Sequence, residues 1–151
     1  MIKQVIQDQY RSKINQLIDI KQITRPKEGW IRTLRKTLGM SGPQLAKRLD
    51  VSKSQASQME RMEIEDRITL KQLRRVADTL DCDLVYALVP RQSVDSMIRD
   101  RAKLKAEQLV SKTDVQMKLE AQQLSNEKLQ EQVKFEAERL VREMPRDLWA
   151  D

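Results

Sequence analysis

Four polar side chains near the middle of the chain have a chemistry and spacing suited to reading nucleic-acid bases. They are Lys53, Ser54, Ser57 and Gln58, which share one face if this segment is helical. A lysine can donate to guanine O6 or N7, a glutamine can pair with adenine N6 and N7, and a hydroxyl can bond to a base or a phosphate. We therefore predict that these four residues contact base edges. The alternative is that they are ordinary polar residues facing water.

A second set of residues could hold the phosphate backbone of the same nucleic acid. Phosphate contacts fix the register of a protein on a duplex, and they come from cations, hydroxyls, amides and helix N-termini. Glu60 carries the charge of DNA itself, so we expect it to anchor its own helix internally instead. The phosphate candidates lie close to the base-reading set in sequence: Ser52, Gln55, Gly42, Gln44, Arg48, Arg35 and Lys36.

Two short helices must position these residues. Ser41 and Ser52 can each cap a helix N-terminus, and the first helix breaks near Asp50. Two short helices joined by so tight a turn predict a helix-turn-helix, whose second helix fits the major groove of DNA. An ordinary helical hairpin is the alternative. Their apolar stripes would be Leu45, Ala46 and Leu49, then Val51, Ala56 and Met59.

The positive charge of the chain is concentrated in this part. Residues 24–61 hold nine Lys or Arg against three acids, a surplus equal to the net charge of +6 of the whole chain. Residues 91–151 hold twelve of each sign. A surplus located at the predicted reading segment is what attraction to phosphate requires.

Composition favours an all-α fold, because the chain has only three glycines, four prolines and 3% aromatic residues. The absence of histidine and the single cysteine exclude a histidine-based catalytic centre and the usual zinc site within one chain. We interpret Cys82 as a core residue in a reducing cytosol. Glu63, Glu65 and Asp66 fall in a predicted polar loop, Arg61 to Ile68, and are interpreted as solvated charges. We expect no enzyme and no cofactor.

Apolar residues at helical spacing predict further helices around the reading motif. Residues 1–23 form an amphipathic helix that must pack on the body or on a partner chain. Within a DNA-binding domain at 30–81, one helix starts at Trp30 and ends at Gly39. Thr69 caps the last helix, with Gln72 in the capping-box position. The expected buried face of that helix is Leu70, Leu73, Val76, Ala77 and Leu80.

Residues 82–90 are rich in β-branched and aromatic side chains and predict a strand that Pro90 ends. A lone strand leaves its backbone donors and acceptors unpaired. We therefore predict a homodimer joined partly by pairing with the same strand of a second subunit. The alternative is an extended segment packed on its own helices. The strand residues are Leu84, Val85, Tyr86, Ala87, Leu88 and Val89.

The region 91–151 is neutral overall and predicts helices that brace a dimer or bind a partner. Ser125 offers an N-cap, with Leu124 and Leu129 as a hydrophobic staple. Pro145 ends the last helix, and Leu148 and Trp149 form an apolar tail that could tuck into the body. No apolar run is long enough to span a membrane and no secretion signal is evident, so we expect a cytoplasmic protein. The apolar face of the last helix would be Leu129, Val133, Ala137, Leu140, Val141 and Met144.

The segment 30–90 resembles the DNA-binding domains of phage-repressor type, the Cro and 434 repressor class. That class implies a compact bundle of about five helices that binds double-stranded DNA with inverted symmetry. Gly42 and Pro43 follow the first cap where the class often has a glutamine, so Gly42 would contact phosphate through its backbone N–H. The residues that carry the resemblance are Leu45, Ala46, Leu49, Val51, Ser52, Ser57, Glu60, Leu73, Ala77 and Leu80.

A closer resemblance, to the family called mobile mystery protein A, uses more of the chain. It lies in the segments 29–32, 38–40, 84–90 and 146–149. Members of that family occur beside a Fic-domain protein, so the resemblance implies a small regulator that is the antitoxin partner of a Fic-type toxin. The letters of Thr24 to Gly29 match a Fic-antitoxin helix motif, although Pro26 disfavours a continuous helix there.

These patterns predict a mainly helical protein with a repressor-like helix-turn-helix bundle, flanking N- and C-terminal helices, and one short strand paired across a dimer. The first functional hypothesis is a sequence-specific repressor of its own operon with an antitoxin-like partner role. The alternative is an interaction module whose outer helices sequester a partner enzyme, with DNA binding secondary.

Overall fold

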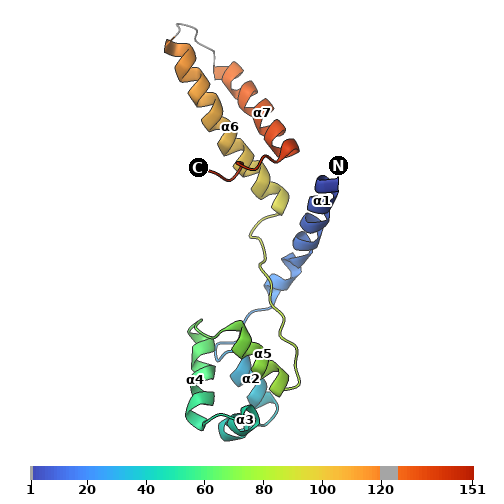
Figure 1. Ribbon diagram of the computed structural model, residues 1–151, viewed down its shortest axis with the longest axis vertical. Coiled ribbons are helices and arrows are strands. Elements are labelled where there is room, and N and C mark those ends of the chain that lie inside the picture. Colours follow the sequence, from blue (N-terminus) through green and yellow to red (C-terminus); the bar gives the residue numbers. More distant parts are fainter. Residues whose placement is uncertain (1, 120–125) are drawn as a thin grey trace. The chain divides into compact units, whose positions relative to one another are not determined.

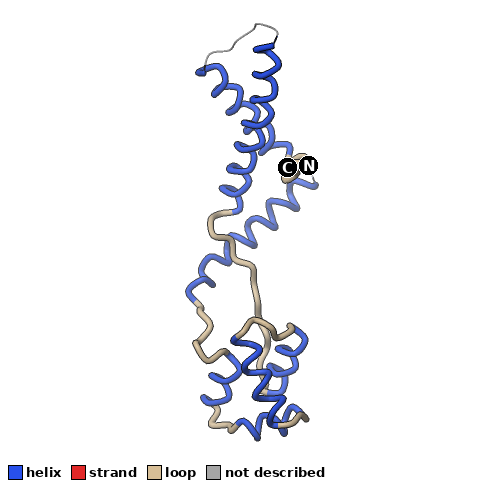
Figure 2. The backbone as a smooth tube through the Cα atoms, turned by 90° about the vertical axis from the view of Figure 1, so that its left-hand side faces the viewer, coloured by secondary structure: helices blue, strands red, loops and turns tan. Residues whose placement is uncertain are grey.

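A computed structural model describes residues 2–119 and 126–151 of the chain, with side chains described for 2–113 and 126–151. The chain divides into two compact units, Ile20–Leu88 and the pair of segments Met1–Asp19 and Val89–Asp151. All regular elements in the described residues are helical (Figures 1 and 2), as composition predicted.

The unit Ile20–Leu88 is a small bundle of α2 (Trp30–Thr37), α3 (Gly42–Leu49), α4 (Lys53–Ile64) and α5 (Leu70–Thr79). The predicted pair of short helices is confirmed as α3 and α4, and Asp50 makes the sharp turn between them with φ of 55°. Leu70 was expected inside but is 45% exposed, because it lies in the first turn of α5. The core consists of Ile31, Leu45, Leu49, Met59, Val76 and Leu80.

Hydrogen bonds at the helix starts explain why α3, α4 and α5 begin where they do. Ser41, Ser52 and Thr69 each accept from a backbone N–H three residues on, and the glutamine at that position accepts from the cap's own N–H. All three therefore form complete capping boxes. At the end of α2, Gly39 has φ of 68°, a left-handed conformation that glycine adopts without strain.

Helix α2 is capped by a residue from another helix. Its N-cap position is Gly29, which has no side chain, and Glu63 accepts from the backbone N–H groups of Trp30 at 2.7 Å and Ile31 at 2.9 Å. The prediction of Glu63 as a solvated loop charge is wrong, because α4 continues to Ile64 and buries this carboxylate at 4% exposure.

Residues 82–90 have no strand assignment, and the backbone N–H groups of Asp83 to Val89 donate no hydrogen bond within the described chain. The predicted strand is therefore not confirmed: within the single chain the segment is irregular, and a strand requires a neighbour that pairs with it. Leu84 is half-buried, and the Arg74 guanidinium lies 6.0 Å from the Tyr86 ring centre. Val85 and Leu88 are 81% and 91% exposed.

The stretch Thr24 to Gly29 is a loop that closes in a turn, where the Gly29 N–H donates to the Pro26 carbonyl at 2.9 Å. The helix that the Fic-antitoxin motif requires is therefore not formed at these residues.

The second unit contains α1 (Ile2–Asn15), the 3-10 helix η1 (Gln16–Gln22) at its boundary, α6 (Val94–Leu119) and α7 (Asn126–Glu143). Helices α6 and α7 pack side by side, as both views show (Figures 1 and 2). Their core consists of Ile98, Ala102, Ala106, Leu140 and Leu148.

The C-terminal tail of this unit returns to α6. Leu148 is 1% exposed, which confirms that the tail packs on the body, whereas Trp149 is 58% exposed. Arg101 holds the tail, because its Nε donates to the Leu148 carbonyl and its Nη2 to the Ala150 carbonyl, both at 2.7 Å. Helix α7 ends before Pro145 as predicted. The predicted N-cap Ser125 and the staple residue Leu124 lie outside the described residues.

Candidate nucleic-acid interface

Helix α4 separates its residues into a buried face and an exposed polar face. Ala56, Met59, Glu60 and Glu63 are buried against the bundle. The base-reading candidates Lys53, Ser54, Ser57 and Gln58 are all exposed. The N-terminal half of α4 therefore presents hydrogen-bonding side chains outward from a helix that is fixed by its other face, which suits a helix that enters a groove.

The fixed face of α4 is held by a buried ion-pair network. Arg35 donates to Glu60 through Nε at 2.6 Å and Nη2 at 3.3 Å, and Arg32 adds an Nε contact at 3.2 Å. The Glu60 and Arg35 side chains are 7% and 12% exposed. The hydrogen bond to Glu60 raises the pKa of Arg35, so the guanidinium stays charged. The structure thus places Glu60 inside the domain, where the sequence placed it.

Arg35 was predicted to contact phosphate, but its geometry assigns it to the bundle. Its remaining nitrogen, Nη1, donates to the Met40 carbonyl at 3.0 Å. All three guanidinium nitrogens are therefore engaged inside the domain, and the side chain ties α2, the α2–α3 turn and α4 together.

The capping boxes fix the side chains of the phosphate candidates that lie at the helix starts. Gln44 Oε1 accepts from the Ser41 N–H at 2.8 Å, and Gln55 Oε1 accepts from the Ser52 N–H at 3.0 Å. Since each amide oxygen is occupied, each side-chain NH2 group remains as a donor. Pro43 of α3 and Lys53 of α4 line one shallow hollow of about 540 Å³ with Ser52 and Gln55. Two helix N-termini, with their partial positive charge, thus meet at one surface.

The remaining phosphate candidates differ in the contacts that they already make within the domain. Gly42 is half-buried, and a Cβ built on it meets no atom within 4 Å. Arg48 is exposed, and within the described residues it makes no ion pair or hydrogen bond. Lys36 donates to both Glu28 oxygens, at 2.9 and 3.0 Å, and this hydrogen bond lowers the pKa of Glu28. Both side chains are about half-exposed, so a phosphate can compete for the lysine.

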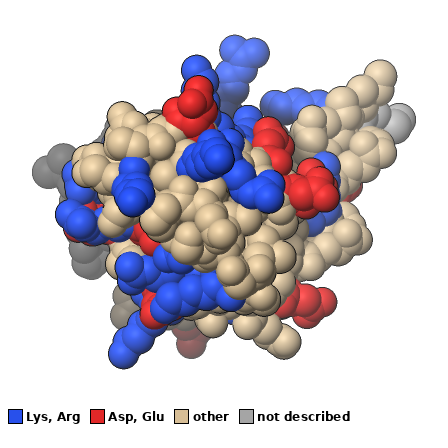
Figure 3. Space-filling model, turned by 90° about the horizontal axis from the view of Figure 1, so that it is seen from below, with Lys and Arg blue, Asp and Glu red and all other residues tan. Residues whose placement is uncertain are grey.

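Figure 3 views the end of the molecule at which α3 lies in Figure 1. Lysine and arginine side chains occur at several places on that face, with fewer acidic groups between them. Of the nine Lys and Arg residues in 24–61, all except Arg32 and Arg35 are exposed, so most of this charge surplus lies on the surface.

Two arginines with structural roles were not singled out from the sequence. Arg25 Nη1 donates to the Glu63 carbonyl and to Asp66 Oδ1, both at 2.8 Å, and so closes the end of α4. Arg75 Nη2 donates to the Leu49 carbonyl at the end of α3. Gly29 leaves α2 without a side-chain cap of its own, but this does not identify Glu63 as the residue that supplies one.

The fold and the exposed face of α4 define a helix-turn-helix domain. Residues 31–86 match the model of the helix-turn-helix family HTH_3, which supports the repressor-type class, DNA binding and a role in transcriptional regulation. No curated protein and no solved structure matched the chain. Among the described residues, no helix has the length and apolar character needed to cross a bilayer.

Proposed function

We propose that this chain is a sequence-specific transcriptional regulator without enzymatic activity, which acts in the cytoplasm as a homodimer on an inverted-repeat operator. The observation that carries the proposal is the exposed polar half of α4 on a helix anchored by Glu60 and Glu63. A helix held this firmly can present Lys53 and Gln58 to base edges in a fixed register.

The phosphate contacts follow from the elements around α4. The N-terminus of α3, with Gly42 and Gln44, and the N-terminus of α4, with Ser52 and Gln55, supply oriented donors. The exposed side chains of Arg48 and Lys36 add positive charge near these donors. In a dimer, two copies of α4 would read half-sites about 34 Å apart, one turn of the duplex.

The test compares two double variants in footprinting and gel-shift experiments with the DNA upstream of the gene. Lys53→Ala/Gln58→Ala removes the two base-reading candidates with the largest expected effect. Gln108→Ala/Lys112→Ala makes the same two changes on exposed positions of α6. We expect the first variant to lose about 1–3 kcal/mol of specific affinity per residue, and the second to bind normally.

Binding should also weaken as salt rises, with unchanged preference for the operator over random DNA in the wild-type chain. If the Lys53/Gln58 variant weakens equally on operator and random DNA, the base-reading role is rejected. If the wild-type chain shows no preference for any upstream sequence even at low salt, the proposed function fails.

We further propose that the regulator represses its own operon and acts as the antitoxin-like partner of a Fic-domain protein. This step is supported by the resemblance in the segments 29–32, 38–40, 84–90 and 146–149. Co-expression of the full chain with the Fic-domain protein encoded beside it, followed by co-purification and a toxicity assay, tests the step. Absence of both complex and protection would reject the antitoxin role and leave DNA binding unaffected.

The second candidate function is a protein-interaction module with DNA binding secondary. It is favoured by the apolar side chains that unit 1–19/89–151 exposes, among them Ile2, Tyr10, Leu104 and Phe135. The Lys53→Ala/Gln58→Ala chain discriminates the two functions. A partner effect retained after loss of operator binding favours the module, whereas loss of every phenotype favours the regulator.

A further inference from the structure

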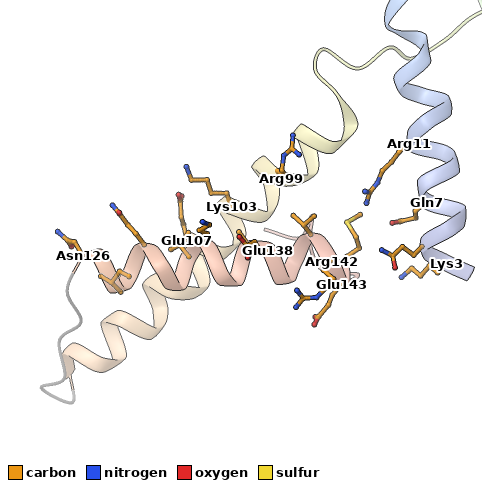
Figure 4. A pocket seen from close by; sticks show the side chains of 18 residues that line it. Lys3, Gln7, Arg11, Arg99, Lys103, Glu107, Asn126, Glu138, Arg142 and Glu143 are labelled. Carbon is orange, nitrogen blue, oxygen red and sulfur yellow. The ribbon is translucent and has the colours of Figure 1, made fainter. Parts of the chain in front are cut away.

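Helix α1 is amphipathic, and it turns its polar face toward its own unit. Asn15 Oδ1 accepts from the Val94 N–H at 3.0 Å, and Asn15 Nδ2 donates to Asp95 at 3.2 Å. Arg11 lies 3.5 Å from the same Asp95 carboxylate. Figure 4 shows Lys3, Gln7 and Arg11 pointing from α1 toward α6 and α7. None of the residues of α1 is buried.

The apolar face of α1 consequently points away from the unit. Ile2, Ile6, Tyr10 and Ile14 recur every four residues and are 79%, 43%, 64% and 38% exposed. A row of large apolar side chains of this length on one helix is uncommon on a soluble surface and marks an interface. The helix cannot rotate its apolar row inward without breaking the three contacts that Asn15 and Arg11 make with Val94 and Asp95.

The same unit contains a groove with an apolar floor that nothing apolar fills, and its α6 wall consists of the charged residues Arg99, Lys103 and Glu107. A pocket of about 1160 Å³ lies along α7, between α6 and α1 (Figure 4). Its floor is Leu129, Val133, Ala137 and Val141, all half-buried and again spaced by four residues. The wall contributed by α1 is polar, from Lys3, Gln4, Gln7 and Arg11. The groove therefore lacks an apolar occupant.

The exposed row and the groove match each other. Ile2 to Ile14 and Leu129 to Val141 both span twelve residue steps, about 18 Å of helix. Rows of i, i+4 side chains from two helices interdigitate in the commonest mode of helix packing.

We propose that α1 of each chain docks its apolar row into the α6–α7 groove of a second copy, and that this reciprocal exchange holds the homodimer. This inference rests on the proposed function, because the homodimer is part of that function. A reciprocal contact is closed and two-fold symmetric, and exchange of an identical element is a low-cost route to a dimer. Because Asn15 and Arg11 hold the polar face of α1 on its own unit, the apolar row can dock on the partner while that face stays in place.

The size of the contact fits a specific interface. At roughly 100 Å² of exposed surface for each large apolar side chain, two docked helices and their two grooves would bury on the order of 1,500 Å². Stable protein–protein interfaces bury about 1,200–2,000 Å² in total.

Disulfide trapping between two differently tagged full chains tests the arrangement. Cys82 is replaced by alanine, one chain receives Ala137→Cys, and the other receives Tyr10→Cys or Ile6→Cys. A parallel docked helix places Tyr10 beside Ala137, and an antiparallel one places Ile6 there. We expect one of these pairs to give a cross-linked dimer of two chains. A chain with Asp8→Cys, on the polar side of α1, is the matched control and should give none.

The strength of association provides the second readout. Ile6→Glu/Tyr10→Glu changes only exposed positions, so the fold should persist, and we expect the dimer dissociation constant in sedimentation to rise at least tenfold. Ser12→Glu, at an exposed position of α1 outside both the apolar row and the groove, should leave it unchanged. A dimer unaffected by the double variant, a monomeric wild-type chain, or cross-links formed only within one chain would each overturn the proposal. All measurements are made without DNA, so failure of operator binding alone leaves this inference standing.

Discussion

Glutamates occupy two positions on the buried face of α4 where an apolar side chain would be expected. Glu60 neutralises Arg35 and Arg32, and Glu63 caps α2. Both carboxylates therefore connect α4 to α2 through contacts that a leucine cannot make. A buried carboxylate is tolerated where it is fully paired, and the same pairing fixes the angle at which α4 is presented.

Removing the charge of Glu60 tests this view. Glu60→Gln leaves the guanidinium of Arg35, 12% exposed, without its carboxylate, so we expect a loss of about 3 kcal/mol in the free energy of unfolding. Glu65→Gln is the matched control, because its pair with Arg67 is exposed on both sides and should contribute less than about 1 kcal/mol. Urea denaturation measures both. Equal, small losses would show that the Glu60 network does not hold α4.

The role of Glu60 could be predicted from sequence, and that of Glu63 could not. Glu60 is part of the helix that we expect to approach the phosphates, and DNA would repel its carboxylate. This repulsion already favours an internal role for Glu60. Glu63 depends on where α4 ends and on which other helix lacks a cap, and both are set by tertiary packing. The internal partners of Arg35 could not be predicted for the same reason, since a cation in a basic segment reveals its partner only in the folded bundle.

At the scale of elements, the starts of α3, α4 and α5 follow from local sequence. A serine or threonine with a glutamine three residues on specifies a capping box whatever the tertiary context. The residues that form the α3–α4 motif could therefore be located before any packing was known.

Mutating the capping residue of α4 and mutating one of its base-reading candidates should have different effects. Ser52→Ala removes the capping hydroxyl, so we expect a loss of about 1 kcal/mol of stability. Ser54→Ala, two residues away and exposed, should leave the melting temperature unchanged and lower operator affinity. Thermal denaturation and gel shifts on the same two proteins check this. The reverse pattern, with stability lost only at Ser54, contradicts the assignment of the cap.

The three glycines provide a test of how tightly Glu63 closes α2. Gly29 has φ of 84°, and a Cβ there would lie 2.8 Å from Glu63 Oε1. Gly39 has φ of 68° with open space around it, and Gly42 has neither constraint. We expect Gly29→Ala to be the most destabilising, by about 1–3 kcal/mol, Gly39→Ala to cost about 1 kcal/mol, and Gly42→Ala to be neutral. Denaturation curves that rank Gly39→Ala above Gly29→Ala would contradict the close approach.

At the scale of the whole molecule, residues distant in sequence come together in ways that patterns along the chain do not reveal. The amphipathic pattern of residues 1–23 predicts a helix but not its neighbours, and α1 groups with α6 and α7 rather than with the adjacent bundle. Likewise, the composition of residues 82–90 favours a strand, yet within residues 2–119 and 126–151 no segment supplies the second strand. In the predicted dimer, the same segment of the second subunit would supply the missing strand. Hydrogen exchange can test this pairing directly.

If Leu84 to Val89 pair with the same segment of a second copy, their amides become protected when the dimer forms. The N–H groups of Asp83 to Val89 have no acceptor within the described chain, so any slow exchange there must come from the partner. We expect protection to rise with protein concentration, and Leu88→Pro, at a position 91% exposed, to weaken the dimer by removing one ladder donor. Arg91→Ala, just beyond Pro90, is the control and should leave dimerisation unchanged. Fast exchange throughout this segment at concentrations where the chain is dimeric would reject the paired ribbon and leave the α1 contact to account for the two-fold assembly.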